Sequence, residues 1–354
     1  MLNNIKLFAL AHFHSTVIKK IQQETLNSVI LTFDIPENLK AHFSFKAGQY
    51  LTLQAKVGKD LLKRSYSICS SPSSGLLQVG VKAISKGLFS NYLNDALREG
   101  DSIEISKPEG RFIFDKPDGS KKYCGFASGS GITPIMSIIQ EVLVSNSKNV
   151  FVLAYGNKSK ASTMFLEKIQ QLKSDYKGRF FSYSIYSQET HSEDTFGRID
   201  SNFIRFVLNQ HPNFSFDKIY LCGPEEMIKS SSATLVDQGN DKDNIVFELF
   251  YSKPKAEVTE SSGAQVKIHY DDEVFEVNVP ENMTILDAAL QKNLDVPYSC
   301  QGGVCSTCIA KITSGSAKMI QNNILTDAEV EEGLVLACQA VPLSKNITID
   351  FDDV

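Results

Sequence analysis

The sequence predicts a multidomain chain: an antiparallel β-barrel, then a doubly wound α/β domain on a parallel sheet, then a small α+β domain. Short strands separated by Gly, Pro, Asn and Asp clusters fill residues 15–115, which is typical of a small barrel. Apolar strands then alternate with helices as far as residue 251, which is typical of a parallel sheet. The 354 residues are enough for two or three separate cores.

The composition is that of an ordinary globular protein, with 42% hydrophobic and 22% charged residues. No apolar run approaches the ~20 residues that cross a bilayer, and no basic stripe points to nucleic acid. Residues 265–354 carry 14 acidic and 5 basic side chains, which is a net charge of −9, whereas the rest of the chain has a net charge of +4. This asymmetry fits electrostatic docking between the parts or onto a basic partner, and equally a solvated acidic surface.

The cysteines indicate a reducing compartment, and we expect a cytoplasmic protein. Three of the seven, Cys69, Cys124 and Cys222, are too scattered for a disulfide framework. The apolar stretch Leu7–Ala11 is shorter than the ~7–15 residues of a signal-peptide core. The six histidines show no second metal-ligand pattern.

The remaining four cysteines form the most specific motif in the chain. Cys300, Cys305 and Cys308 have the spacing Cys-x4-Cys-x2-Cys, and Cys338 follows at a distance. This spacing is that of a plant-type [2Fe–2S] cluster, whereas structural zinc sites usually have paired short spacings on both sides. The sequence therefore predicts these four thiolates as iron ligands, on a loop that Gly302 and Gly303 allow to fold tightly. Such a cluster carries one electron at a time.

The predicted barrel contains two informative stretches. Its strands are expected at Ser15–Ile21, Ser28–Ile35, Tyr50–Ala55, Arg64–Cys69, Leu76–Ala83 and Ser102–Ile105, with a helix at Phe89–Arg98. Arg64-Ser65-Tyr66-Ser67 places a guanidinium, an aromatic ring and hydroxyls on one strand. Gly87-Leu88-Phe89-Ser90 begins the helix, and a helix start is a natural seat for an anion.

The predicted α/β domain contains two turns of similar character. Its strands are expected at Tyr123–Ala127, Val150–Tyr155, Phe180–Tyr186, Ile219–Cys222 and Ile245–Phe250. Its helices are expected at Ile135–Val144, Met164–Leu172, Asn202–Leu208 and Glu225–Leu235. Gly129-Ser130-Gly131-Ile132-Thr133-Pro134 follows the first strand and departs from the dinucleotide fingerprint, because Pro134 stands at the third glycine. Cys222-Gly223-Pro224 follows the fourth strand.

Together and in this order, these motifs resemble the ferredoxin–NADP reductase family. The resemblance implies a flavin with Arg64 on its diphosphate, Tyr66 against the isoalloxazine and Ser67 near the reactive ring edge. The flavin-binding residues that it implies are Arg64, Ser65, Tyr66, Ser67, Gly87, Leu88, Phe89 and Ser90, with Lys82 as a weaker candidate. FAD is favoured over FMN, because a helix-end anion site suits a diphosphate better than a monophosphate.

The same resemblance implies a nicotinamide site. Its residues are Gly129, Gly131, Thr133, Pro134, Asn157, Lys158, Cys222, Gly223, Pro224 and Phe250. Cys222, Glu248, Tyr66 and Ser67 are the catalytic candidates, although Cys222 could also be a plain buried cysteine at a strand end. The plant reductases end at the aromatic that corresponds to Phe250, whereas this chain continues.

The nucleotide choice is argued from the end of the second strand of the α/β domain. Tyr155-Gly156-Asn157-Lys158-Ser159-Lys160 offers two lysines and no acid, which favours the 2′-phosphate of NADPH over NADH. Gln188 is neutral where many relatives have an arginine, so NADH remains open.

The C-terminal part is predicted to be a tethered ferredoxin-like domain. A hairpin is expected at Val266–Tyr270 and Val274–Val279, then a helix Ile285–Gln291 capped by Thr284, then strands Ile309–Thr313 and Ile347–Asp350. The resemblance gives these elements a β-grasp arrangement. The expected domains are 1–115 for FAD, 116–251 for NAD(P), a linker at 252–263, and 264–354 for the cluster.

The order of the three modules resembles the reductase components of multicomponent oxygenases, most nearly those of the phenylacetyl-CoA epoxidase type in phenylacetate catabolism. The resemblance implies electron transfer from NADPH through FAD and the [2Fe–2S] cluster to an external oxygenase, expected to contain a diiron centre. A flavin must stand between the other two, because nicotinamide gives two electrons and the cluster takes one. A general NAD(P)H reductase for a desaturase or a Rieske oxygenase is the first alternative. An iron–sulfur redox sensor or binding module is the second.

Overall fold

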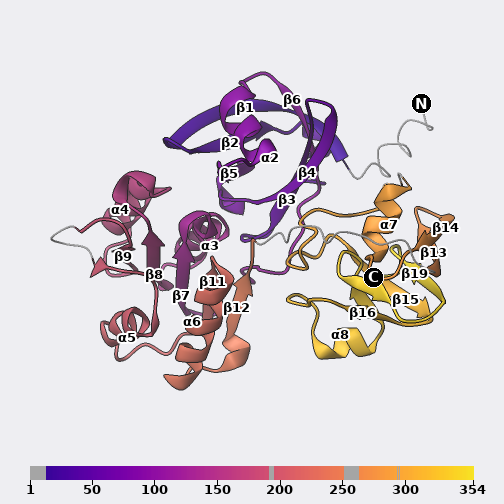
Figure 1. Ribbon diagram of the computed structural model, residues 1–354. Helices are drawn as coiled ribbons and strands as arrows, with labels where there is room; N and C mark the ends of the chain where they lie inside the picture. The colour runs from indigo at the N-terminus through magenta and orange to yellow at the C-terminus, as the bar shows by residue number, and fades with distance from the viewer. Residues whose placement is uncertain (1–12, 191–194, 251–262, 293, 295) are drawn as a thin grey trace. The chain divides into compact units, whose positions relative to one another are not determined.

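The computed structural model describes residues 13–190, 195–250, 263–292, 294 and 296–354. The chain forms two compact units, Met1–Leu249 and Phe250–Val354. The first contains the barrel and the α/β domain, and the second contains the four-cysteine domain (Figure 1). The expectations for Leu7–Ala11 and for residues 252–262 of the linker lie outside the described residues. No helix in the described part of the chain has the length and apolar character needed to cross a bilayer.

The barrel is a six-stranded antiparallel sheet with the order β4-β3-β6-β1-β2-β5. Its strands are β1 Phe13–Thr25, β2 Ser28–Asp34, β3 Tyr50–Val57, β4 Asp60–Ser67, β5 Gln78–Lys82 and β6 Ser102–Ser106. A bridge between Ile68 and Val79 joins the two outer strands and closes the barrel. Alternate residues of β1 are buried, so its inward side chains fill the interior with those of the other strands. The predicted antiparallel barrel is confirmed.

The helix expected at Phe89–Arg98 is shorter and irregular. The α-helix α2 covers only Leu88–Asn91, and a π-type turn follows at Tyr92–Ala96. The side-chain amide of Asn94 donates to the Ser90 carbonyl at 2.8 Å, which is the acceptor that an α-helix would offer to the Asn94 N–H. This local competition explains why the α-helical pattern stops after one turn.

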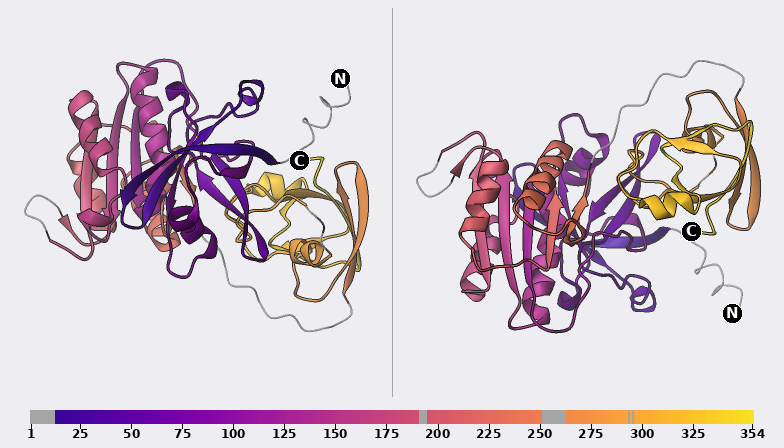
Figure 2. Two further views of the ribbon diagram at one scale, coloured as in Figure 1. Left: turned by 90° about the horizontal axis from the view of Figure 1, so that it is seen from above. Right: turned by 90° about the horizontal axis from the view of Figure 1, so that it is seen from below.

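The α/β domain has a parallel sheet with the order β10-β9-β8-β7-β11-β12. Its strands are β7 Lys122–Ser128, β8 Val150–Asn157, β9 Phe180–Tyr186, β10 Thr195–Phe196, β11 Lys218–Cys222 and β12 Ile245–Glu248. Its helices are α3 Ile132–Ser145, α4 Leu166–Asp175, α5 Ser201–Asn209 and α6 Glu225–Asp237. Helices α3 and α4 cover one face and α5 and α6 the other (Figure 1; Figure 2). The doubly wound sheet is confirmed, and the two-residue edge strand β10 is an addition to it.

Several hydrogen bonds fasten the α/β domain to the barrel. Ser137 of α3 donates its hydroxyl to the Ser70 carbonyl at 2.5 Å, and Gln140 donates its amide to the Cys69 carbonyl at 3.0 Å. On the far side of the seam, Glu24 of β1 accepts the Phe165 N–H at 2.8 Å. These bonds fix how the ends of the parallel strands face the barrel.

Gly80 of β5 allows the barrel and the α/β domain to approach each other closely. A Cβ at this position would lie 2.6 Å from the Thr133 methyl group and 3.2 Å from the Met164 methyl group. A glycine inside a strand often marks such a close approach of another segment.

The second unit has a five-stranded mixed sheet with the order β14-β13-β19-β15-β17. Its strands are β13 Ala264–Tyr270, β14 Glu273–Val279, β15 Ile309–Ser314, β17 Leu334–Leu336 and β19 Asn346–Asp350. Helix α7 covers Ile285–Gln291 as predicted, and the Thr284 hydroxyl accepts the Asp287 N–H at 3.1 Å as its cap. The pairing of β13 with β19 is parallel, which gives the β-grasp arrangement.

The sequence reading missed four short elements of this unit. They are β16 Ala317–Met319, α8 Asp327–Glu331, β17 and β18 Ala340–Pro342. Each spans five residues or fewer, so none shows a readable hydrophobic period.

Candidate active site and cluster site

Strand β4 presents the Arg64-Ser65-Tyr66-Ser67 motif of the barrel. The strand pairs with β3 residue by residue, so Arg64 and Tyr66 extend from one face and Ser65 and Ser67 from the other. The Arg64 side chain is exposed and donates to the Lys63 carbonyl at 2.6 Å, whereas Ser67 is buried. The strand thus separates an accessible cation from a buried hydroxyl.

Tyr66 is held by an aromatic stack. Its ring lies 6.3 Å from the Phe89 ring at an interplanar angle of 23°, and Phe89 lies 6.3 Å from Tyr92. Burial raises the pKa of Tyr66 above its ordinary value, although Arg64 opposes the shift, so the phenol stays neutral. Phe89 is itself buried, so it supports the Tyr66 ring and has no exposed ring face for a ligand.

The start of α2 is shaped by a glycine. A Cβ on Gly87 would lie 2.4 Å from the Ile84 side chain and 2.6 Å from the Ser90 hydroxyl. That hydroxyl accepts the Ile84 N–H at 3.2 Å, so it fastens the turn before the helix. Leu88 is exposed, and the first-turn N–H groups of a helix have no intrahelical acceptors. The backbone here can therefore receive an anion.

A buried polar cluster lies where the barrel meets the sheet. Ser67 donates its hydroxyl to the Glu248 carboxylate at 3.1 Å, across 181 residues of sequence. Cys222 pairs directly with Glu248 in the register of β11 and β12. Three of the four predicted catalytic residues, one from the barrel and two from the sheet, thus converge at one place.

The titration of this cluster is set by burial. Burial raises the pKa of Glu248 to about 8, with the Ser67 hydrogen bond acting in the opposite direction. Burial raises the pKa of the Cys222 thiol as well, and the Glu248 charge adds to that shift. At neutral pH the cluster is therefore a neutral carboxylic acid beside a neutral thiol.

The two glycine-rich turns of the α/β domain are in direct contact. A Cβ on Gly131 would lie 2.2 Å from the Cys222 carbonyl oxygen, so only glycine fits between the turns. Thr133 donates its hydroxyl to the Ser130 carbonyl at 3.0 Å, and Pro134 is buried in the first turn of α3. On the other side, Gly223 and Pro224 lead into α6. The turns therefore form one surface at the carboxyl ends of β7 and β11.

The end of β8 carries the other predicted nucleotide-binding residues. Asn157 is 8% exposed, and its side chain lies within hydrogen-bonding reach of the Tyr155 hydroxyl group. Lys158 beside it is exposed. A buried amide at the end of a parallel strand is well placed to contact a bound polar ligand.

The structure places Lys82 with these residues and not with the start of α2. Its ammonium donates to the Ser162 carbonyl at 2.9 Å. Burial, and the neighbouring charge of Lys158, lower the pKa of Lys82. Lys82 therefore contacts the α/β domain, and its role as a weaker candidate for flavin binding stays a prediction.

Phe250 follows β12 and is 46% exposed. The resemblance gave it the place of an aromatic that closes the active site. The following residues, 251–262, lie outside the described part of the chain.

In the second unit, the four cysteines of the motif converge. The Cys300 thiol interacts with those of Cys305 and Cys338, and the Cys338 thiol also interacts with that of Cys308. The hydrogen bonds that Cys300 receives from its neighbouring thiols hold its pKa well below the usual value. The Ala337 N–H donates to the Cys308 carbonyl at 2.9 Å, which brings the remote cysteine beside the loop.

The cysteine loop turns at Gly303, as predicted, and at Gln301 in place of the predicted Gly302. Gln301 and Gly303 have φ angles of 52° and 69°, both in the left-handed region. The Gly302 N–H points at the Cys300 sulfur from 3.4 Å, and the Val304 N–H also bonds to that sulfur. A loop that directs backbone N–H groups at a thiolate is suited to an iron–sulfur cluster.

The comparisons with known proteins agree with this geometry. Three family models match: an oxidoreductase FAD-binding domain over residues 15–114, an oxidoreductase NAD-binding domain over 126–233, and a 2Fe-2S iron-sulfur cluster binding domain over 268–343. One of the subunits of 1,2-phenylacetyl-CoA epoxidase from Escherichia coli (strain K12) is 36% identical over 96% of this chain and 98% of its own length. The chain belongs to the ferredoxin–NADP reductase family, in the branch with a C-terminal [2Fe–2S] domain. It is an oxidoreductase that uses FAD, a pyridine nucleotide and a [2Fe–2S] cluster.

Two further similarities extend over almost the whole reductase. The ferredoxin reductase component of 3-ketosteroid-9-alpha-monooxygenase from Rhodococcus rhodochrous is 28% identical over 94% of this chain and 95% of its own length. The solved structure of phthalate dioxygenase reductase has a TM-score of 0.61 at 22% identity, over 96% of this chain and 98% of that one. The second similarity shows that the two proteins share the fold.

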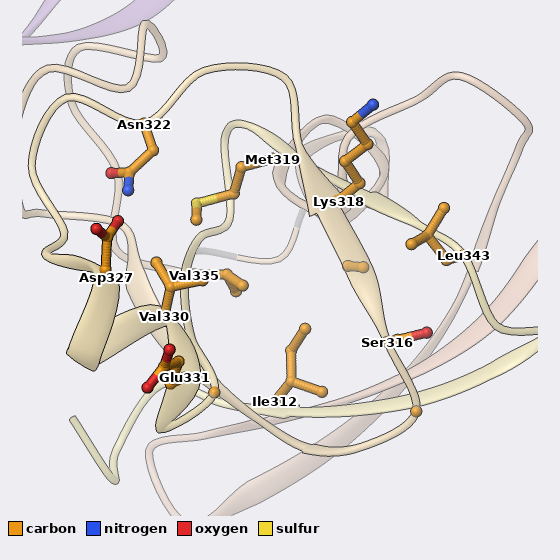
Figure 3. A pocket seen from close by; sticks show the side chains of 13 residues that line it. Ile312, Ser316, Lys318, Met319, Asn322, Asp327, Val330, Glu331, Val335 and Leu343 are labelled. Atoms are coloured by element: carbon orange, nitrogen blue, oxygen red, sulfur yellow. The ribbon is translucent and has the colours of Figure 1, made fainter.

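The reductase has a separate pocket of about 750 Å³ in its [2Fe–2S] domain (Figure 3). Residues of β15, β16 and α8 line it, among them Met319, Asp327 and Val330. None of the cysteines and none of the other predicted site residues belongs to this lining. The pocket is therefore no part of the site described above.

Sequence reasoning missed two residues that shape these sites. Gly80 allows Thr133 to approach β5, and an isolated glycine within a strand was the available signal. Gln339 lies against the cysteine loop, and only its position directly after Cys338 could have drawn attention to it.

Proposed function

We propose that this reductase takes electrons from NADPH and delivers them, through FAD and the [2Fe–2S] cluster, to a separate oxygenase component of the phenylacetyl-CoA epoxidase type. The observation that carries the proposal is that one chain contains both the buried Ser67–Glu248–Cys222 cluster and the four converging cysteines. The identity of 36% over 98% of the related epoxidase chain supports this choice of acceptor. The domains are proposed at 1–115, 116–251 and 264–354 with a linker at 252–263, and the three matched ranges lie within the domains.

The flavin would be held by β4 and the start of α2. The exposed Arg64 guanidinium suits a diphosphate, because its planar fork can donate two parallel hydrogen bonds to phosphate oxygens. The first-turn amides of Leu88, Phe89 and Ser90 would receive the same group. Tyr66, stacked on Phe89, supplies a rigid ring for the isoalloxazine to lie against. A bound flavin supplies the exchange between two-electron and one-electron transfer.

The Ser67–Glu248–Cys222 cluster would position the nicotinamide. The surface formed by the Gly131 and Gly223 turns would receive the nucleotide. The fully buried Cys222 lies at the innermost part of this surface. Glu248 is neutral below about pH 8, so it can hold a proton at its carboxyl group next to Ser67. The seam between barrel and sheet excludes water from this place, since Ser67, Cys222 and Glu248 are all buried.

The preference for NADPH is proposed from the cations near the end of β8. Lys158 is exposed there, and Lys82 lies near enough for Lys158 to influence its pKa. Arg198 is also exposed and follows Gly197, whose N–H donates to the Tyr186 carbonyl at 2.8 Å. This bond places Arg198 next to the Ser187-Gln188 turn, where it can supply the positive charge that Gln188 lacks.

Kinetics with the two nucleotides test this preference. We expect a higher kcat/KM with NADPH than with NADH. Lys158→Ala and Arg198→Ala should each reduce the NADPH value by roughly tenfold, about 1.4 kcal/mol of lost phosphate binding, and leave NADH unchanged. Lys168→Ala, an exposed lysine on α4, is the matched control. A wild-type preference for NADH would contradict the proposal.

Reconstitution tests the proposed acceptor. The purified reductase is mixed with the oxygenase component of a phenylacetyl-CoA epoxidase and its substrate, and NADPH oxidation is compared with product formed. We expect one product per NADPH with this oxygenase, and uncoupled or absent turnover with a desaturase or a Rieske oxygenase. Coupling to one of those instead would support the general-reductase alternative. Absence of any NADPH turnover with ferricyanide or cytochrome c would support a redox sensor.

We further propose that the reductase works in the cytoplasm. Cys69, Cys124 and Cys222 are all buried free thiols, which is the state expected in a reducing compartment. Fractionation of the native cell with an antibody against the chain tests this, and recovery outside the cytoplasmic fraction would contradict it.

A further inference from the structure

Gln339 follows the fourth cysteine and turns its side chain toward the cysteine loop. Its amide nitrogen lies 3.4 Å from the Gln301 carbonyl oxygen, 2.9 Å from the Cys338 carbonyl oxygen and 3.6 Å from the Cys338 sulfur. The residue is only 4% exposed. One side chain therefore reaches both segments that carry the cysteines.

The cysteine loop is shaped to receive this side chain. A Cβ on Gly303 would lie 2.8 Å from the Gln339 Cγ and 3.2 Å from the Gln321 carbonyl oxygen. Gly303 also has a φ of +69°, a conformation that side-chain-bearing residues rarely adopt. Glycine is needed here both for the turn and for the space that Gln339 fills.

The backbone fixes Gln339 in this place. Its N–H donates to the Leu336 carbonyl at 2.8 Å, and its carbonyl accepts the Ile320 N–H at 2.9 Å. A buried amide must find hydrogen-bond partners, and the two loop segments supply them. The Gln339 side chain is therefore held next to the thiols by the fold itself.

We propose that Gln339 is a positioning residue for the [2Fe–2S] cluster. Its amide ties the Cys338 segment to the three-cysteine loop, and it directs an N–H at the Cys338 sulfur. Hydrogen bonds to cluster sulfurs favour the more negatively charged reduced state, so this donor raises the reduction potential. The inference rests on the proposed assignment of the four cysteines as ligands.

Gln339→Met tests the proposal in the full-length holoenzyme. Methionine keeps the length of the side chain and removes the N–H donor. We expect a lower cluster reduction potential in a redox titration, shifted g-values in the EPR spectrum of the reduced cluster, and faster iron loss to a chelator. NADPH–ferricyanide activity should stay unchanged. Gln291→Met, the same replacement at an exposed position on α7, is the control and should match the wild type.

Gly303→Ala reaches the same contact from the other side. The added methyl group should displace Gln339 and change the potential and the g-values in the same direction. In a Gln339→Ala background the displaced atoms are absent, so Gly303→Ala should produce a smaller further change. This cycle still measures the contact if Gln339→Met fails to assemble a cluster.

Two results would overturn the inference. A Gln339→Met holoenzyme whose potential, g-values and iron loss match those of wild type and Gln291→Met would show that the amide has no role. Equal effects of Gly303→Ala in both backgrounds would show that the two residues act independently. Wild-type protein that binds no iron would instead refute the proposed ligand set, so the two failures can be told apart.

Discussion

The proposed hydride site and the proposed cluster site of this reductase are built in opposite ways. The hydride site is assembled from distant segments, since Ser67 and Glu248 meet across 181 residues, and its side chains lie on strands in a buried seam. The cluster site draws three of its four thiols from one short loop, Cys300–Cys308. The proposed hydride site therefore depends on how two domains pack, whereas three of the four proposed cluster ligands depend on one local loop.

The largest expected effect is a loss of electron transfer through the cluster with no loss of activity at the proposed hydride site. Cys305→Ser removes one of the four proposed iron ligands, so transfer to cytochrome c or to the oxygenase should fall by at least 100-fold. NADPH–ferricyanide activity should stay near the wild-type value, because the hydride site shares no residue with the cysteine loop. Steady-state assays with both acceptors check this. Equal survival of both activities would show that the cluster is not the exit for electrons.

The reverse separation is expected from Glu248→Gln. The substitution keeps the shape of the side chain and removes the carboxyl group beside Ser67 and Cys222. Flavin reduction by NADPH, followed by stopped flow, should slow by roughly 100-fold, the lower end of the range that is typical for loss of a positioned acid or base. The EPR spectrum of the cluster should not change. An altered cluster spectrum would mean that the two sites are not independent.

A pair of glycine variants tests how tightly the two turns of the hydride site approach. Gly131→Ala places a Cβ 2.2 Å from the Cys222 carbonyl oxygen, so it should destabilise the fold by about 1–3 kcal/mol and weaken nucleotide binding. Gly129→Ala meets no atom within 4 Å and has only its left-handed φ of +55° to strain, which costs about 1–2 kcal/mol. Chemical denaturation and NADPH titration distinguish them. Equal nucleotide affinity in the two variants would contradict the close approach.

A pH dependence of stability gives a further test of the buried seam. The pKa of Glu248 is raised to about 8, so the folded state holds a proton that the unfolded state releases near pH 4.3. The contribution of the neutral acid is fully present below that pH and is lost, at about 1.4 kcal/mol per pH unit, as the pH rises toward 8. Glu248→Gln should remove this slope between pH 5 and 8. Glu167→Gln, an exposed acid on α4, should not.

The architecture could be predicted from the sequence because the strands of both large sheets have regular patterns of apolar residues. Strand β9 and helix α7 have the predicted bounds, and the apolar strands of the α/β domain could be recognised by their length and spacing. The short elements around the cysteine loop could not, since hydrogen bonds to distant residues define them. The Ile320 N–H, for example, bonds to the Gln339 carbonyl.

The candidate sites follow the same division. The cysteine motif could be recognised from its spacing alone, since one loop contains three of the four cysteines, and their role as iron ligands stays a prediction. The family resemblance named Ser67 and Glu248 as separate catalytic candidates, but their contact appeared only in the structure, because no local pattern records a contact between separate domains. The placement of Lys82 beside Ser162 needed the structure, since it depends on how α4 and its preceding turn lie against β5.

The burial of Cys69, Cys124 and Cys222 has a practical consequence. These thiols are at most 3% exposed, and burial raises the pKa of each, so they persist in the unreactive protonated form. Of the seven cysteines Cys300 alone is not buried, so it is the thiol that a reagent in solution reaches first. An alkylating reagent applied to the folded protein should therefore label Cys300 before the other cysteines, and its uptake reports how accessible this one proposed iron ligand is.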